Sequence, residues 1–172
     1  FTLLCFINTV HHQVIEDAQV VELLRLNGKR LHHREVQELE FKEQFSLAAL
    51  ADYFRDFDAF ANNRGGFLIF GVADSPRRLV GLTGTSFDSL DEAKVTEFLN
   101  SAFSPEIRYE KFSKDYAGKH VGIIYVPACE NRPVVAIKNS GDIKEADIYY
   151  RYNARNDRVK YPELKAMFDH AR

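Results

Sequence analysis

The chain has no tryptophan, only two cysteines and a formal net charge of -2. Its 14 phenylalanines and 8 tyrosines provide enough apolar bulk for a core without tryptophan. Because Cys5 and Cys129 form neither a metal-binding pair nor a disulfide framework, we expect a protein of the reducing cytoplasm. The small net charge excludes a chain that is basic throughout, so any nucleic-acid binding requires a local basic patch.

The first ten residues are apolar, but they are too few to span a membrane. No basic segment precedes the apolar one and His11-His12 follows it, so we predict no signal peptide. We therefore expect no membrane partner. Because the sequence begins at Phe1 and its only methionine is Met167, we expect it to be part of a longer polypeptide.

The length of 172 residues suits one domain, and a hydrophobic fraction of 45% with a charged fraction of 28% is typical of globular proteins. The sequence contains no internal repeat, no low-complexity tract and no clear linker. Predicted helices and strands are interspersed along the chain. We therefore predict an α+β fold, in which a mixed β-sheet is flanked by helices within a single domain.

Apolar residues at helical spacing predict four helices. These helices cover residues 14–26, 46–62, 89–102 and a final stretch that begins at Pro162. Asn27-Gly28 is expected to end the first helix, because both residues tolerate the left-handed conformation. Ser46 is expected to cap the second helix, and residues 89–92 are expected to form a capping box for the third.

Alternating or continuous apolar residues predict six strands. These strands cover residues 38–42, 67–72, 107–112, 120–126, 133–137 and 148–152. In the first strand, Leu39 and Phe41 are predicted to face the core, while Glu38, Glu40 and Lys42 share the other face. The second strand is apolar throughout, which predicts that both of its faces are covered, and residues 73–76 form a turn after it.

Three acidic residues and a lysine surround these first two strands. Asp74 lies just past the buried strand, where functional residues are common. If the two strands are neighbours, Glu35, Glu40 and Asp74 could converge and supply the oxygen ligands that Mg²⁺ or Mn²⁺ prefers. A metal ion there could polarise a phosphate, with Lys42 offsetting developing negative charge. From spacing alone, the alternative is an exposed strand with a local salt bridge.

Several common catalytic patterns are absent from the sequence. Gly65-Gly66 follows a predicted helix rather than a strand, so it is not a phosphate-binding P-loop. No G-x-S-x-G or H-E-x-x-H motif is present. No set of cysteines and histidines suggests zinc, and the adjacent pairs His11-His12 and His32-His33 are predicted to be surface residues.

Basic residues gather near the end of the chain, among four tyrosines. Arginine side chains suit phosphates, and tyrosine rings can stack on unpaired bases. The predicted nucleic-acid contacts are Arg64, Arg151, Arg155, Arg158 and Lys160. Arg77-Arg78, just beyond Asp74, could also touch a nucleic-acid backbone. The alternative is a solvated turn between a strand and a helix, with the tyrosines packed.

A set of short motifs along the chain forms a recognisable combination. In order, the motifs are Glu35, Glu40-Phe41-Lys42, Ala59 to Asn62, Gly65-Gly66, Gly71 to Asp74, Val80-Gly81, Arg132-Pro133-Val134 and Tyr149-Tyr150-Arg151 with Arg158. Over residues 31–170, this combination resembles the Schlafen AlbA_2 domain family. The family has Gly-Ser-(Ser/Thr) after its arginine strand, whereas this chain has Asn153-Ala154-Arg155.

The resemblance implies a nucleic-acid-binding domain over residues 31–172. The resemblance does not explain the segment before Leu31, and we expect residues 1–30 to be a helical segment that packs on the domain or contributes to an oligomer contact. In the Schlafen branch, two glutamates and an aspartate form a metal-dependent ribonuclease site that cuts structured RNA such as tRNA. Carried over, these are Glu35, Glu40 and Asp74, with Lys42 beside them and Mg²⁺ or Mn²⁺ as the cofactor.

Three functions remain open at this point. The first is the metal-dependent endoribonuclease, and the second is a non-catalytic module that binds DNA as a regulator. The third is an ATP-binding protein, since the family was once described as ATPase-like, although no P-loop supports it. The resemblance also leaves a homo-oligomer open, because relatives often form dimers.

Overall fold

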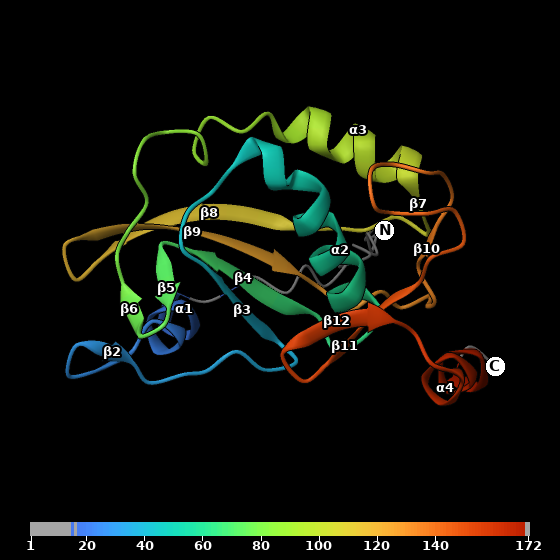
Figure 1. Cartoon of the computed structure of the whole chain (residues 1–172), viewed down its shortest axis with the longest axis horizontal. Helices are drawn as coiled ribbons and strands as arrows, with labels where there is room; N and C mark the ends of the chain where they lie inside the picture. The colour runs from blue at the N-terminus through green and yellow to red at the C-terminus, as the bar shows by residue number, and fades with distance from the viewer. Residues whose placement is uncertain (1–14, 16, 171–172) are drawn as a thin grey trace, which may run out of the picture.

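A four-stranded sheet with the order β3-β4-β9-β8 lies at the centre of the computed structural model, which describes residues 15 and 17–170 (Figure 1). Its strands are β3 (Leu39–Lys42), β4 (Gly66–Phe70), β9 (Lys119–Val126) and β8 (Glu110–Tyr116). β3 runs parallel to β4, and the other neighbours in the sheet are antiparallel. With its helices, this mixed sheet confirms the predicted α+β fold.

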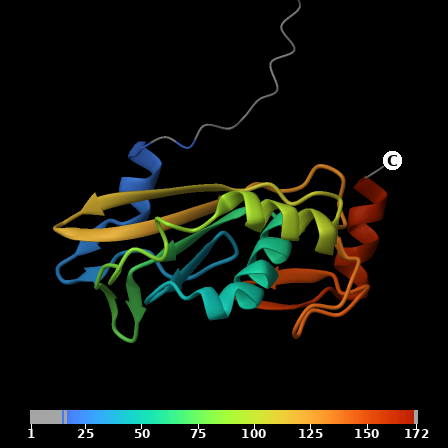
Figure 2. The same ribbon diagram turned by 90° about the horizontal axis from the view of Figure 1, so that it is seen from above.

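Helices cover both faces of the sheet (Figure 2). The helices are α1 (Asp17–Leu23), α2 (Leu50–Ala61) with a preceding 3-10 turn η1 (Leu47–Ala49), α3 (Glu92–Ala102) and α4 (Tyr161–His170). The core on one face contains residues of α2 and α3, and the core on the other face contains residues of α1. None of the described helices is both long and apolar enough to cross a membrane.

The side chains of β4 point into two separate hydrophobic cores, one on each face of the sheet. Leu68 and Phe70 belong to the core beneath α2 and α3, whereas Phe67 and Ile69 belong to the core beside α1. Successive side chains of a strand point to opposite faces, so a continuous apolar run fits a strand that is covered on both sides. All residues of β4 are buried, which confirms the prediction made from the run.

Four two-stranded ribbons complete the fold. They are β1 (Leu26–Asn27) with β2 (Arg30–Leu31), β5 (Val72–Asp74) with β6 (Arg77–Leu79), β7 (Phe103–Ser104) with β10 (Val135–Ala136), and β11 (Tyr149–Tyr152) with β12 (Arg155–Arg158). The pairs are all antiparallel. The sequence predicted no strand over residues 155–158, yet this segment is a strand because its backbone pairs with β11 in full register.

The first helix is shorter than predicted. It ends at Leu23, and the expected stop, Asn27-Gly28, instead lies in the hairpin that joins β1 to β2. Gly28 has a φ of 64° in that two-residue turn, a conformation that glycine adopts without strain. Val20 and Leu24 are 1% and 0% exposed and pack in the core beside the sheet. The predictions for residues 1–14 lie outside the described residues.

Two predicted helix caps differ from the observed ones. Ser46 precedes η1, but its side chain makes no capping hydrogen bond. At α3 the N-cap is Asp91, whose carboxylate accepts a hydrogen bond from the backbone N–H of Lys94 at 3.2 Å. Ser89 instead donates to the carbonyl oxygen of Thr85, so the capping box does not form. The helix therefore begins later than the sequence motif predicts.

Candidate functional site

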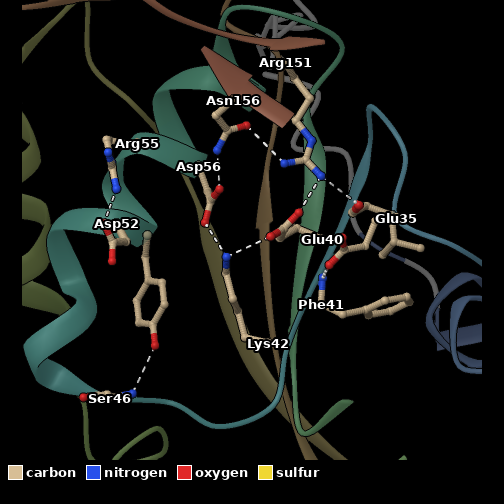
Figure 3. Close-up of polar contacts among 12 residues, drawn as sticks. Glu35, Glu40, Phe41, Lys42, Ser46, Asp52, Arg55, Asp56, Arg151 and Asn156 are labelled. Carbon is tan, nitrogen blue, oxygen red and sulfur yellow. Dashed lines mark hydrogen bonds and ion pairs between the residues drawn. The ribbon is translucent and has the colours of Figure 1, made fainter. Parts of the chain in front are cut away.

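Glu40 and Lys42 project from β3 toward α2 and the β11–β12 ribbon, as Figure 3 shows. Their neighbours on β3, Leu39 and Phe41, are buried in the opposite core, as their alternation predicts. The side chains of Glu40 and Lys42 are 12% and 28% exposed, so this face is not the open surface expected of a solvated charge pair. It is covered by Asp56 of α2 and by residues of the ribbon.

Five side chains close a ring of polar contacts, which we call the charge ring: Glu40, Lys42, Asp56, Asn156 and Arg151 (Figure 3). Glu40 Oε1 lies 2.8 Å from Lys42 Nζ, and Glu40 Oε2 lies 2.6 Å from Arg151 Nη2. Lys42 Nζ lies 3.4 Å from Asp56 Oδ2. Asn156 donates to Asp56 and accepts from Arg151 Nη1 at 3.1 Å. Two cations thus neutralise two carboxylates.

Arg151 is the most buried member of the ring, with a side chain that is 1% exposed. Beyond Glu40, its guanidinium donates to the carbonyl oxygens of Val36 at 3.2 Å and Leu39 at 3.1 Å. It also lies 5.3 Å from the centre of the Phe60 ring. The sequence predicted Arg151 to be a nucleic-acid contact, but it is buried and all its hydrogen bonds are internal. Its side chain instead acts as a clamp, by which we mean that it holds the start of β3 against the β11–β12 ribbon.

Asp56, which no sequence motif singled out, supplies the second carboxylate of the ring. Burial raises its pKa to about 6, an effect that Lys42 opposes and Glu40 reinforces. No donor among the described residues forms a hydrogen bond with its Oδ2, so the ion pair with Lys42 compensates for the burial of this oxygen. Burial lowers the pKa of Lys42, but the charges of Asp56 and Glu40 outweigh that effect and raise it. The lysine is therefore held in its charged form.

Glu35 and Asp74 lie beside the ring but outside it. Glu35 Oε1 accepts a hydrogen bond from the backbone N–H of Phe41 at 3.0 Å. Burial raises the pKa of Glu35, and the negative charges of Glu40 and Asp74 add to the rise, against the opposing effects of the Phe41 N–H and Arg151. The structure therefore brings the three predicted carboxylates into one region, where they interact electrostatically.

A pocket of about 340 Å³ opens at Glu35 and Asp74. Its remaining lining residues are Arg34, Arg77 and Ala154. Asp74 ends β5, directly opposite Arg77 of β6 in the ribbon register. Ala154 belongs to the turn between β11 and β12, so the tip of that ribbon meets the acidic residues.

The predicted three-carboxylate metal centre is not assembled among the described residues, where no group of three or more potential ligands is arranged to hold an ion. Glu40 is turned toward Arg151 and Lys42 instead. Glu35 and Asp74 remain at the pocket, and one or two carboxylates with several waters are the usual protein ligands of Mg²⁺. A cation held by these two carboxylates stays a prediction.

The other predicted basic contacts lie at the surface. Arg64, Arg155, Arg158 and Lys160 are exposed. Arg158 forms an ion pair with Asp147, with Nε at 2.6 Å from Oδ1, yet its side chain remains 63% exposed. Lys160 Nζ lies 4.9 Å from the centre of a tyrosine ring, that of Tyr152. Arg155 and Arg158 belong to β12, and Lys160 lies two residues beyond it. The β11–β12 ribbon and the residues just after it therefore carry three of the four exposed basic residues that the sequence predicted as contacts.

The glycine pair at the end of α2 has a packing role. Gly65 has a φ of 77°, and a Cβ atom there would lie 2.8 Å from the carbonyl oxygen of Val126. A Cβ atom at Gly66 would lie 2.4 Å from the ring of Phe60. Both positions require glycine so that the chain can turn tightly from α2 into β4. This geometry agrees with a helix stop rather than a phosphate loop.

Comparisons with known proteins place this chain in a family. The family model described as Schlafen, AlbA_2 matches residues 35–160, so the chain belongs to the Schlafen AlbA_2 family. The "Uncharacterized ATP-binding protein UU034" of Ureaplasma parvum serovar 3 is 34% identical over 160 residues, which cover 84% of this chain and 45% of that protein. The chain therefore spans less than half the length of this curated relative.

A solved structure supports the fold assignment. The DIP2311 protein from Corynebacterium diphtheriae matches with a TM-score of 0.58 and 19% sequence identity. The match covers 86% of this chain and 30% of that one. At this identity the likeness concerns the fold alone.

Proposed function

We propose that this chain is a nucleic-acid-binding domain that acts as a metal-dependent endoribonuclease on structured RNA such as tRNA. The observation that carries the proposal is the convergence of Glu35 and Asp74 at one pocket, next to the basic β11–β12 ribbon. Carboxylates provide ligands for Mg²⁺ or Mn²⁺, and the arginines of the ribbon suit an RNA backbone. Membership of the Schlafen AlbA_2 family agrees with this assignment.

Each residue of the proposed site has a distinct task. Glu35 and Asp74 would hold the cation, which when bound supplies Lewis-acid activation of a phosphate and of water. Lys42 stays charged between Glu40 and Asp56. From beside the pocket it would offset negative charge that develops on a bound phosphate. Glu40, which we also propose as an acidic residue of the site, fixes the position of Lys42.

The direct test is cleavage of tRNA by the chain with Mg²⁺ or Mn²⁺. We expect Glu35→Gln and Asp74→Asn to slow cleavage by about a hundredfold or more, as removal of a catalytic electrostatic contact typically does. Glu38→Gln is a matched control, because Glu38 is an exposed carboxylate just before β3 that does not line the pocket. Equal cleavage by all four proteins would exclude the assigned site.

A non-catalytic binding module is the second candidate, and the neutralised state of Glu40 favours it. With Glu40 paired to Arg151 and Lys42, the acidic set at the pocket is reduced to two residues. This candidate predicts binding of RNA or DNA that weakens with salt and shows no turnover. Arg158→Ala would then weaken binding, while Glu35→Gln would not reduce it.

ATP binding is a third candidate, suggested by the name of the Ureaplasma relative. In this chain the paired glycines pack against backbone and ring atoms and do not form a P-loop. Calorimetric titration with Mg-ATP tests this candidate: a saturable heat of binding that Arg77→Ala leaves unchanged would support a separate nucleotide site, and no saturable heat would count against it.

A further inference from the structure

The pocket at Glu35 and Asp74 combines two carboxylates with two guanidinium groups. Arg34 and Glu35 come from the segment ahead of β3, and Asp74 and Arg77 come from the β5–β6 ribbon. Ala154 places the tip of the β11–β12 ribbon at the same pocket. Three segments that are distant in the sequence thus build one charged concavity. No sequence motif gave Arg34 a role, and Arg77 was expected only near a nucleic-acid backbone.

The four charged groups of the pocket do not form ion pairs with one another. Among the ion pairs formed by the described residues, none includes Arg34, Glu35, Asp74 or Arg77. Glu35 and Asp74 line the same pocket and carry charges of the same sign, so each disfavours the other there. A ligand that carries both signs of charge would satisfy all four groups.

We propose that Arg34 and Arg77 bind a phosphate of a nucleic-acid backbone in this pocket, and that this binding depends on a divalent cation at Glu35 and Asp74. The inference rests on the proposed function and deepens it. The two arginines and two carboxylates have a net formal charge of zero. Without a cation, a bound phosphate would therefore be repelled by both carboxylates, and a divalent cation between them would remove this repulsion. Guanidinium groups form paired hydrogen bonds with phosphate oxygens, which suits them to this task.

The β6 strand provides a matched control. Arg78 follows Arg77 directly, but successive side chains of a strand point to opposite faces. Arg78 is exposed and does not line the pocket. Arg77→Ala and Arg78→Ala therefore remove the same charge from the same strand, and only the first removes it from the pocket.

The experiment measures binding rather than turnover. A short, fluorescently labelled RNA is titrated with the full chain with and without Mg²⁺, and affinity is read from anisotropy. Gel electrophoresis of the same samples checks that the RNA is still intact. In Mg²⁺, we expect Arg34→Ala and Arg77→Ala to weaken binding by about tenfold each, the effect of losing a charged hydrogen bond. Arg78→Ala should change affinity by less than about twofold, because it leaves the pocket intact.

Cation dependence gives a second readout. Mg²⁺ should strengthen binding by the wild-type chain, and by thermodynamic reciprocity the oligonucleotide should strengthen Mg²⁺ binding equally. The double variant Glu35→Gln with Asp74→Asn should bind the oligonucleotide with no Mg²⁺ effect, because the repulsion and the cation ligands are both removed. Thermal melting of each variant checks that the fold is retained.

Several results would overturn the inference. Equal losses in Arg77→Ala and Arg78→Ala would show general charge attraction, and a wild-type chain indifferent to Mg²⁺ would exclude the cation from binding. Displacement of the oligonucleotide by Mg-ATP would assign the pocket to a nucleotide instead of a backbone phosphate. If tRNA is not cleaved but binding depends on Arg77 and Mg²⁺, the ribonuclease proposal fails and this inference stands. If tRNA is cleaved with an unchanged KM in Arg77→Ala, the ribonuclease proposal stands and this inference fails.

Discussion

Replacing Arg151 with alanine should destabilise the chain severely, because its guanidinium has four internal acceptors. These acceptors are the carbonyl oxygens of Val36 and Leu39, Glu40 Oε2 and Asn156 Oδ1, at distances between 2.6 and 3.2 Å. The side chain is only 1% exposed, so water does not replace these contacts without rearrangement. The variant leaves a largely buried carboxylate with one cation instead of two.

The expected loss follows from these contacts. Removing one partner of a buried ion pair costs about 3–5 kcal/mol, and each buried acceptor left unsatisfied costs about 1–3 kcal/mol before relaxation. Because Glu40 retains Lys42 at 2.8 Å, we expect the total to stay near about 3–5 kcal/mol. For a chain of this length, that corresponds to a fall in melting temperature of roughly 6–20 °C.

Urea unfolding followed by far-ultraviolet circular dichroism measures this loss. Arg155→Ala is the matched control, since Arg155 lies on the same ribbon and is exposed, and we expect it to change stability by less than about 0.5 kcal/mol. If Arg151→Ala lowers the free energy of unfolding by less than about 1 kcal/mol, Arg151 does not hold β3 in place and would be a surface residue available for nucleic-acid contacts. Equal losses in the two variants would refute the clamp as well.

Three further predictions concern the buried groups. Burial raises the pKa of Asp56 to about 6, above its ordinary value of 3.8, so the free energy of unfolding of the wild type should fall relative to Asp56→Asn as pH rises from about 4 to about 6. Urea unfolding at several pH values tests this, and a relative rise would contradict it. Gly122→Ala puts a Cβ atom 2.7 Å from the Phe87 ring and should cost about 1–3 kcal/mol, so an unchanged melting temperature would count against that packing. Leu99→Ala, at a fully buried position of α3, should cost about 2–5 kcal/mol in the same unfolding assay, and a loss under about 1 kcal/mol would place Leu99 outside the core.

The sequence predicted the central strands and helices well where their periodicity was strong. β3 alternates and β4 is an unbroken apolar run, and both lie close to their predicted bounds. β12 has the sequence Arg-Asn-Asp-Arg, in which no apolar residue marks a buried face. It is held by backbone pairing with β11 and by side-chain contacts of Asn156 and Arg158, which no local pattern shows.

Glu35, Glu40 and Asp74 were found from the sequence, but Asp56 and the environments of these carboxylates were not. Spacing showed that Glu40 and Lys42 share a face of β3, yet it could not show that Arg151, far along the chain, comes to rest on that face. The only local signal for Asp56 is an acidic residue within a phenylalanine-rich stretch of α2. Tertiary packing decides which carboxylates become paired and which remain at the pocket.

The break between β4 and β5 also depends on a tertiary contact that the spacing of residues in the sequence does not reveal. Gly71 has a φ of 102°, and a Cβ atom there would lie 3.1 Å from the backbone of Gly81. This close approach turns the chain out of the central sheet, so that Asp74 reaches the pocket instead of continuing the strand. The sequence showed both glycines but not their proximity.

The charge ring has a consequence for the order in which the chain acquires its structure. Arg151 and Glu40 are 111 residues apart, and Asn156 and Asp56 are 100 residues apart. Contacts of such separation form late, because a long loop must close before they stabilise anything. While a ribosome is still adding the last third of the chain, Lys42 is the only ring cation present beside two carboxylates. The β11–β12 ribbon thus supplies the second cation, Arg151, to carboxylates on β3 and α2 that were synthesised much earlier.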